Sequence, residues 1–224
     1  MSTTTIKRSP LHSWHESHCD NWCQLGGTSL PRHFTSSAEE RAAISELALC
    51  DLSGLPLFEF KGPGAADWLS ARGLPVPGEI YQGASTPDNG WVTRTGNDEF
   101  LLRGPIDSSH VEMGADFHIN GYQQDLLITS RQDAGLLLAG RRVRELMGQT
   151  CGLDYQALMP RETVFTRVAA VSCGLIKDQL GDNPVCWLWV DASQALYLWQ
   201  ELVQIIEDLA GRVVGAGCFY TEVD

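Results

Sequence analysis

The sequence has 224 residues, of which 43% are apolar and 20% are charged, so it can fold around a sizeable hydrophobic core. Its 16 basic and 28 acidic residues give a net charge of −12, which argues against a nucleic-acid partner because phosphate binding needs a basic face. The opening MSTTTIKRSP leads to no apolar segment and no run of about 18 apolar residues follows, so neither a signal peptide nor a membrane span is expected.

The cysteines predict a reducing environment. There are seven of them, scattered along the chain with no export signal before them. An odd number of cysteines without a compact framework is typical of free thiols, so we expect a cytoplasmic protein.

Residues 1–35 are polar and aromatic with little periodicity, and we expect an extended arm that lies over the core. The capping-box pattern from Ser37 to Glu40 predicts a helix over residues 38–49. The alternating segment 55–60 predicts a strand that carries its phenylalanines on one face.

A glycine–proline corner ends this strand at Gly62 and Pro63. Proline suits the first turn of a helix, where its missing N–H has no partner to lose, so a short helix is expected after the corner. The apolar positions Ala65, Trp68 and Leu69 give this helix one buried face, and it should stop near Gly73.

Two hairpins are predicted in the rest of the chain, over residues 91–104 and 175–190. Their turns contain Gly, Asn and Asp, which tolerate the backbone of tight turns. The apolar stripe from residue 192 to residue 209, capped by Asp191, is the strongest helix prediction. The final VVGAGCFYTEV predicts a strand.

The order of elements repeats itself. The first half runs strand, glycine corner, helix, hairpin. The second half runs strand (135–139), corner at Gly140, helix (141–148), a longer strand (163–172), hairpin and the long helix. We therefore predict an α+β fold of two related halves, with an arm over 1–35, a first half over 36–120 and a second half over 121–224, although chance alternation of elements also produces such an order.

Several segments resemble one family in the same order along the chain. SPLHSWHESHCDNW, GGTSLPRHF and EERAAISELALCDLSGLPLFEFKGPGAADWL resemble the opening of the glycine-cleavage T-protein, the aminomethyltransferase, and LLLAGRRVRELM resembles its second corner and helix. RTGNDEFLLRG and VCWLWVDASQALYLWQEL are similar to the gamma subunit of heterotetrameric sarcosine oxidase, a relative of about this length. The resemblance implies a folate-binding fold that lacks the C-terminal barrel of the aminomethyltransferase.

The resemblance also implies a tetrahydrofolate ligand and residues to hold it. In the family an acidic residue contacts the folate edge that carries the one-carbon unit, where a carboxylate stabilises developing positive charge. Asp88 or Asn89 falls at that position, with Asp88 as the candidate catalytic group, and Tyr81 falls near a tyrosine that lines the pterin pocket. Pro87-Asp88-Asn89-Gly90 is also an ordinary turn sequence, and Tyr81 is also compatible with simple packing.

The sequence departs from the enzymes in the second hairpin. Residues 172–183 keep no match to the arginine-threonine-glycine-tyrosine-threonine-glycine-glutamate run whose glutamate helps to bind folate. We therefore expect a folate-binding or partner subunit in one-carbon metabolism that docks on a larger enzyme, or a homo-oligomer. The alternative is a tetrahydrofolate-dependent aminomethyltransferase or demethylase that acts on a small N-methyl or aminomethyl substrate.

One cluster near the N-terminus has the residue types of a zinc site. It contains the histidines and cysteines His12, His15, His18, Cys19 and Cys23. Structural zinc sites usually pair two short ligand clusters across a chain reversal, and the sequence offers no second cluster. No metal is therefore expected.

Overall fold

The computed structural model describes residues 6–87, 90–104 and 125–220. The described residues form two compact units. Unit 1 takes its residues from 1–54, 133–160 and 164–224, and unit 2 takes its residues from 55–132 and 161–163. Among the described residues, no helix combines the length and the apolar character that a membrane crossing requires.

Unit 1 is built on a six-stranded, mainly antiparallel sheet with the strand order β11-β12-β13-β10-β4-β14. These strands are β4 (Ala48–Asp51), β10 (Ala134–Ala139), β11 (Thr163–Val168), β12 (Val171–Leu180), β13 (Asn183–Val190) and β14 (Arg212–Val213). One face of the sheet packs against α5 (Val143–Thr150) and α6 (Ala192–Asp208). The apolar stripe of α6 meets alternate residues of β10 and β13 there, and Trp199 at its centre is fully buried.

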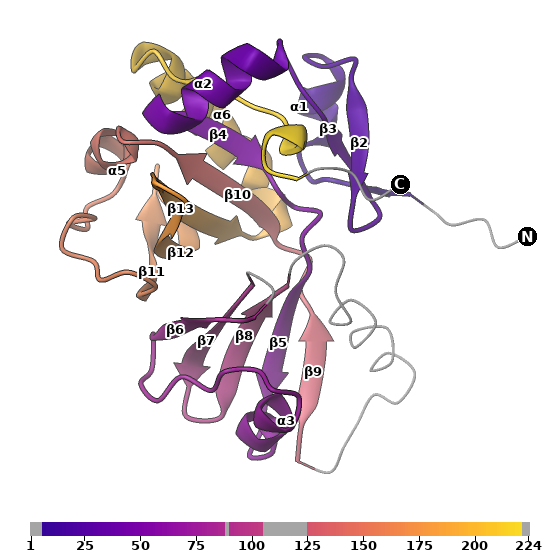
Figure 1. Ribbon diagram of the computed structural model, residues 1–224, viewed down its shortest axis with the longest axis vertical. Coiled ribbons are helices and arrows are strands. Elements are labelled where there is room, and N and C mark those ends of the chain that lie inside the picture. The colour runs from indigo at the N-terminus through magenta and orange to yellow at the C-terminus, as the bar shows by residue number, and fades with distance from the viewer. Residues whose placement is uncertain (1–5, 88–89, 105–124, 221–224) are drawn as a thin grey trace, which may run out of the picture. The chain divides into compact units, whose positions relative to one another are not determined.

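The N-terminal part of unit 1 is a small folded element, where the sequence led us to expect an extended arm. It contains β1 (Lys7–Arg8), α1 (His12–Glu16), β2 (Trp22–Leu25) and β3 (Thr28–Pro31), and its sheet has the order β1-β3-β2. These strands are too short for their alternation to show in the sequence. Figure 1 shows this sheet beside α2 (Ser37–Glu46) and the C-terminal turn η1 (Ala216–Cys218).

Unit 2 is a five-stranded antiparallel sheet in the order β6-β7-β8-β5-β9, with helix α3 (Ala65–Ala71) against it. Its strands are β5 (Leu57–Lys61), β6 (Gly83–Ser85), β7 (Trp91–Gly96), β8 (Glu99–Arg103) and β9 (Leu127–Ser130). The core contains Phe58, Phe60, Phe100 and Trp68 of α3, so the expected phenylalanine face is confirmed.

The two halves of the sequence repeat one set of elements, which confirms the predicted relation between them. The first set is β4, β5, α3, β6, β7 and β8, and the second set is β9, β10, α5, β11, β12 and β13. In each set the first strand pairs outside its own half: β4 pairs with β10, and β9 pairs with β5. This exchange makes each compact unit discontinuous in sequence. The expected boundary at residue 120 lies outside the described residues.

Equivalent glycine corners connect strand to helix in the two sets. Gly62 after β5 has φ 122° and Gly140 after β10 has φ 113°, values that favour glycine. A Cβ on Gly62 would lie 2.3 Å from the carbonyl oxygen of Asp125, and a Cβ on Gly140 would lie 2.4 Å from that of Glu46. Both corners therefore need glycine for its backbone angle and for the close approach of another chain segment.

Four other expectations were wrong in detail. The helix predicted to reach residue 49 ends at Glu46, because residues 48–51 are buried on both faces of a central strand and have no alternation to distinguish them. The capping box uses Ser36 and Glu39, one residue earlier than predicted. The strand predicted over 163–172 is two strands joined by Ala169 and Ala170, both with positive φ. The final segment, as far as Tyr220 where the described residues end, forms the short strand β14 and the turn η1 instead of one continuous strand.

Candidate functional site

Tyr81, the predicted pterin-contacting residue, has an unusual backbone in unit 2. Its φ is 67°, which costs a residue other than glycine about 1–2 kcal/mol. The conformation is fixed because its N–H donates to the Arg94 carbonyl (2.7 Å) and its carbonyl accepts from the Thr163 N–H (2.8 Å). The residue is nevertheless 48% exposed, so burial does not offset the strain. An exposed aromatic residue held in a strained conformation is a candidate for ligand contact.

Arg94 of β7 holds the segment that precedes Tyr81. Its guanidinium donates to the carbonyls of Gly78 (2.9 Å) and Gly96 (3.2 Å), so it connects the incoming segment to the hairpin turn. On the same strand, the Thr93 hydroxyl donates to the Gln82 carbonyl (3.0 Å). Hydrogen bonds to the backbone of this segment therefore hold Tyr81 in place.

Asp88 and Asn89, the other two predicted folate contacts, lie outside the described residues. The flanking Thr86 N–H donates to the Gly90 carbonyl at 3.0 Å. The roles predicted for Asp88 and Asn89 stay predictions.

The N-terminal histidines and cysteines do not converge on one point in the described part of the chain. His12 Nε2 lies 3.0 Å from Glu16 Oε1. His18 stacks on Trp14 with ring centroids 3.8 Å apart, and Cys19 donates to the Asn21 carbonyl. His12, His18 and Cys19 thus contact residues close to them in the sequence, whereas His15 contacts Asp51.

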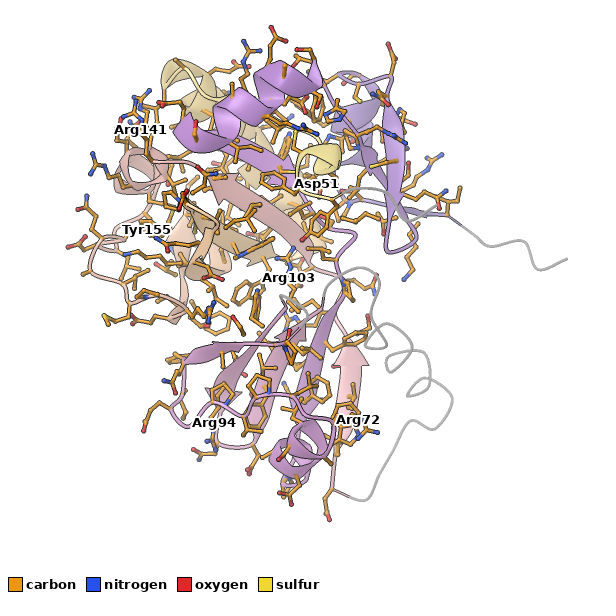
Figure 2. All side chains as sticks on the ribbon, in the orientation of Figure 1. Asp51, Arg72, Arg94, Arg103, Arg141 and Tyr155 are labelled. Carbon is orange, nitrogen blue, oxygen red and sulfur yellow. The ribbon has the colours of Figure 1, made fainter. Side chains whose placement is uncertain are left out.

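Asp51, at the end of β4, organises a buried polar cluster in unit 1 (Figure 2). His15 Nε2 lies 2.8 Å from Asp51 Oδ2, which also accepts from the Ser9 hydroxyl. The Ser53 N–H (2.9 Å) and hydroxyl (2.6 Å) donate to the other oxygen. Burial alone would raise the pKa of Asp51, but the hydrogen bond and charge of His15 and the two serine hydroxyls outweigh it and lower the pKa.

This cluster contains the residue types of a serine hydrolase in the wrong arrangement. A catalytic histidine must bridge the serine and the carboxylate, whereas Ser9 and His15 both donate to the same oxygen of Asp51. His15 is also fully buried. The cluster therefore connects the N-terminal segment to β4 and is not a nucleophilic site.

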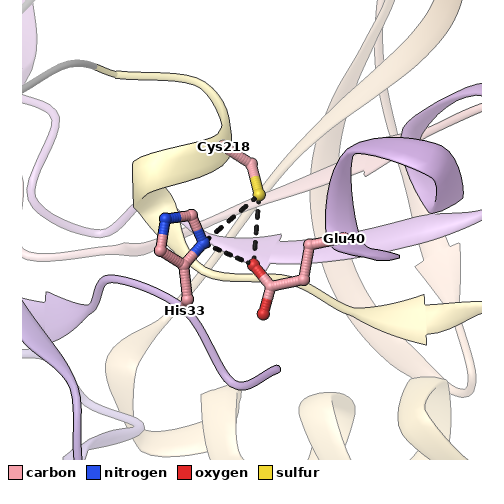
Figure 3. A group of neighbouring side chains, drawn as sticks. All are labelled: His33, Glu40 and Cys218. Carbon is pink, nitrogen blue, oxygen red and sulfur yellow. Dashed lines mark hydrogen bonds and ion pairs between the residues drawn. The ribbon is translucent and has the colours of Figure 1, made fainter. Parts of the chain in front are cut away.

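A second buried carboxylate brings together residues from three places in unit 1 (Figure 3). Glu40 of α2 is fully buried, and its Oε2 lies 2.9 Å from His33 Nδ1 and 3.1 Å from Cys218 Sγ. The same oxygen accepts from the Gly215 N–H at 3.1 Å, and Oε1 accepts from the N–H groups of Phe34 and Thr35. Among the described residues this is the one group of three or more His, Cys, Asp or Glu side chains with metal-ligand spacing.

Sequence reasoning missed this group because its members are far apart in the chain. Glu40 was assigned to the helix cap, and its neighbour Glu39 has that role instead. Cys218 was predicted to lie in a strand, whereas it lies in the turn η1. The one part of the group that is local in the sequence is the pair of His33 and Glu40, which lie seven residues apart on either side of the first residue of α2.

An open groove of about 950 Å³ also lies in unit 1. Trp14, His18 and Phe34 give it an aromatic side, and Gln200, Gln204 and Glu207 of α6 are among its polar side chains. Aromatic residues surrounded by polar ones are typical of surfaces that bind other proteins.

No protein-family model matches the sequence. The fold is that of two solved structures. Aminomethyltransferase T of the glycine cleavage system from Bartonella henselae is 17% identical with a TM-score of 0.76, and the match covers 96% of this chain and 61% of that chain. A chain of the heterotetrameric sarcosine oxidase from Corynebacterium sp. U-96, in complex with pyrrole 2-carboxylate, is 15% identical with a TM-score of 0.66. That match covers 98% of this chain and 100% of the other.

These matches confirm the predicted α+β fold and its resemblance to the T-protein and sarcosine oxidase structures. This chain spans 61% of the length of the aminomethyltransferase that it matches. Identities of 15–17% establish the fold, whereas function depends on the individual site.

Proposed function

We propose that the chain is a partner subunit of a larger enzyme of the heterotetrameric sarcosine oxidase kind, in one-carbon metabolism, and is not catalytic by itself. The observation that carries the proposal is the reciprocal coverage: 98% of this chain matches 100% of a sarcosine oxidase chain. The same fold at the same length therefore exists as one component of a heteromeric oxidase. The aromatic groove beside α6 offers a surface of the composition that partner binding needs.

The test is to purify the tagged protein from its native cells and to assay the preparation with sarcosine and related N-methyl amines. We expect substrate-dependent production of hydrogen peroxide from the complex and none from the recombinant chain alone. A native preparation without oxidase activity, in which the chain is found alone, would overturn the proposal.

The second candidate is a tetrahydrofolate-dependent aminomethyltransferase or demethylase, favoured by the higher TM-score of 0.76 to the aminomethyltransferase and by the strained Tyr81. In this function Tyr81 contacts the pterin, and Asp88 and Asn89 contact the polar edge of the folate, where Asp88 moves a proton. The role is supported by the strain at Tyr81 together with the exposure of almost half of its surface (48%).

Calorimetric titration with 5-formyl-tetrahydrofolate tests folate binding directly. Tyr81→Ala and Asp88→Ala should each weaken it. Tyr197→Ala is the matched control, since Tyr197 is a tyrosine of similar exposure (52%) on α6 of unit 1. Absence of binding at millimolar folate, or equal binding by all four proteins, would exclude this function.

A further inference from the structure

We propose that His33, Glu40 and Cys218 form a binding site for a divalent cation of the zinc type. The three side chains come from the segment before α2, from α2 itself and from the C-terminal turn η1. Their ligand atoms all lie within 4.8 Å of one another. A nitrogen, a carboxylate oxygen and a sulfur are the donor types that Zn²⁺ binds in proteins.

The distances between the three donor atoms fit a common tetrahedral centre. Zinc bond lengths of about 2.0–2.3 Å imply donor–donor separations of about 3.4–3.6 Å around a tetrahedral ion. The observed separations are 2.9 Å for His33 Nδ1 to Glu40 Oε2, 3.1 Å for Cys218 Sγ to Glu40 Oε2, and 3.8 Å for Cys218 Sγ to His33 Nδ1. Movements of a few tenths of an ångström, which side-chain rotation allows, would therefore place the three donor atoms at three corners of a tetrahedron around the ion.

Protons now occupy the place that the cation would take. His33 Nδ1 and Cys218 Sγ both contact Glu40 Oε2, as Figure 3 shows, and the carboxylate oxygen accepts a hydrogen bond from each. On binding, the Cys218 thiol loses its proton to solvent and the thiolate bonds to the cation. His33 also gives up its Nδ1 proton, so that the neutral imidazole binds through Nδ1 and carries its one proton on Nε2. The cation replaces two hydrogen bonds to the carboxylate with three metal–ligand bonds.

The surroundings already hold Glu40 as a ligand. Burial would raise the pKa of Glu40, but donation by His33, by the Thr35 and Gly215 backbone and by Cys218 lowers it, so the carboxylate is charged. Burial and the neighbouring Glu40 raise the pKa of Cys218 to about 12, which is the shift that a bound cation reverses. The backbone donors on Glu40 Oε1 fix its orientation, as outer-shell contacts of metal ligands do.

Two of the three side chains are partly exposed to solvent. The His33 side chain is 16% exposed and Cys218 is partly exposed, whereas Glu40 is fully buried at the base. Three protein ligands would leave the fourth position of a tetrahedral zinc ion to a water or a small ligand. A cation here would also connect the C-terminal turn to the N-terminal part of unit 1.

Titration of the full-length, chelator-treated and reduced protein with Co²⁺ tests the proposal, because a cobalt–thiolate bond has its own charge-transfer absorption. We expect one equivalent to bind with this absorption and with tetrahedral d–d bands. Zn²⁺ should displace the cobalt and raise the unfolding temperature. Cys218→Ser should lose the absorption and bind Zn²⁺ at least about 100-fold more weakly.

Cys151→Ala is the matched control, because Cys151 is a buried thiol of unit 1 outside the group, and it should bind cobalt as the unaltered protein does. His33→Gln provides a second, independent variant, and it should also weaken binding. The absence of a one-equivalent site at about 100 µM Co²⁺, or an identical thiolate absorption in Cys218→Ser, would overturn the proposal.

Discussion

Gly140→Ala should strongly destabilise the protein, because the corner after β10 needs glycine for two separate reasons. The φ of 113° lies in a region that side chains disfavour. The added methyl group would also lie 2.4 Å from the oxygen and 2.5 Å from the carbon of the Glu46 carbonyl, which are backbone atoms with little freedom to move.

The size of the effect follows from these two contributions. Backbone strain costs about 1–3 kcal/mol, and forcing an extra methyl group into a packed site costs about 1–3 kcal/mol more. A total loss of about 2–6 kcal/mol is a large part of the roughly 5–15 kcal/mol that stabilises a typical domain. Gly62→Ala, at the equivalent corner, should cost a similar amount, because its methyl group would lie 2.3 Å from the Asp125 carbonyl oxygen.

The assay is urea unfolding of each purified variant, followed by circular dichroism. Gly148→Ala is the matched control: it is an exposed glycine of α5, eight positions beyond Gly140, and a Cβ there meets nothing within 4 Å. It should stabilise the protein by up to about 1 kcal/mol through helix propensity. A Gly140→Ala variant as stable as the parent, or a Gly148→Ala variant that loses more stability, would refute the reasoning.

Three further predictions concern strain and charge. Ala170→Gly and Ala210→Gly should each stabilise the protein by about 1 kcal/mol in urea unfolding, because both alanines have positive φ; a loss of stability in both would contradict this. Asp51→Asn should lower stability at neutral pH by about 3–5 kcal/mol. The ionised Asp51 stabilises the fold above the pKa of an unfolded aspartate, and this contribution disappears as the pH falls through the lowered pKa of the folded state. The free energy of unfolding should therefore fall less steeply with decreasing pH in the variant than in the parent. An equally steep fall in both proteins would contradict this prediction. Tyr81→Gly should raise stability by about 1 kcal/mol while weakening 5-formyl-tetrahydrofolate binding, and a variant that loses stability would show that the tyrosine packs.

The repeated order of elements was predictable because its signals are local. The glycine corners at Gly62 and Gly140, the hairpin turns and the stripe of α6 each depend on a few neighbouring residues. The phenylalanine face of β5 was predictable from alternation for the same reason. These signals sufficed for the α+β class and the relation between the halves.

Features that depend on distant residues were not predictable in the same way. The exchange of β4 and β9 between the halves is set by pairing, and the fully buried β4 carries no alternating pattern. The turn at Ala169 and Ala170 contains none of the residues that are typical of turns, such as Gly, Asn or Asp. The group around Glu40 requires Cys218, 178 positions further along the chain.

The most direct test of the proposed function is native mass spectrometry of the tagged chain purified from its own cells. The proposal predicts a heteromeric assembly that contains this chain and larger subunits in fixed stoichiometry, with sarcosine oxidase activity in the same fraction. A preparation that contains only this chain, as a monomer or as a homo-oligomer, would contradict it.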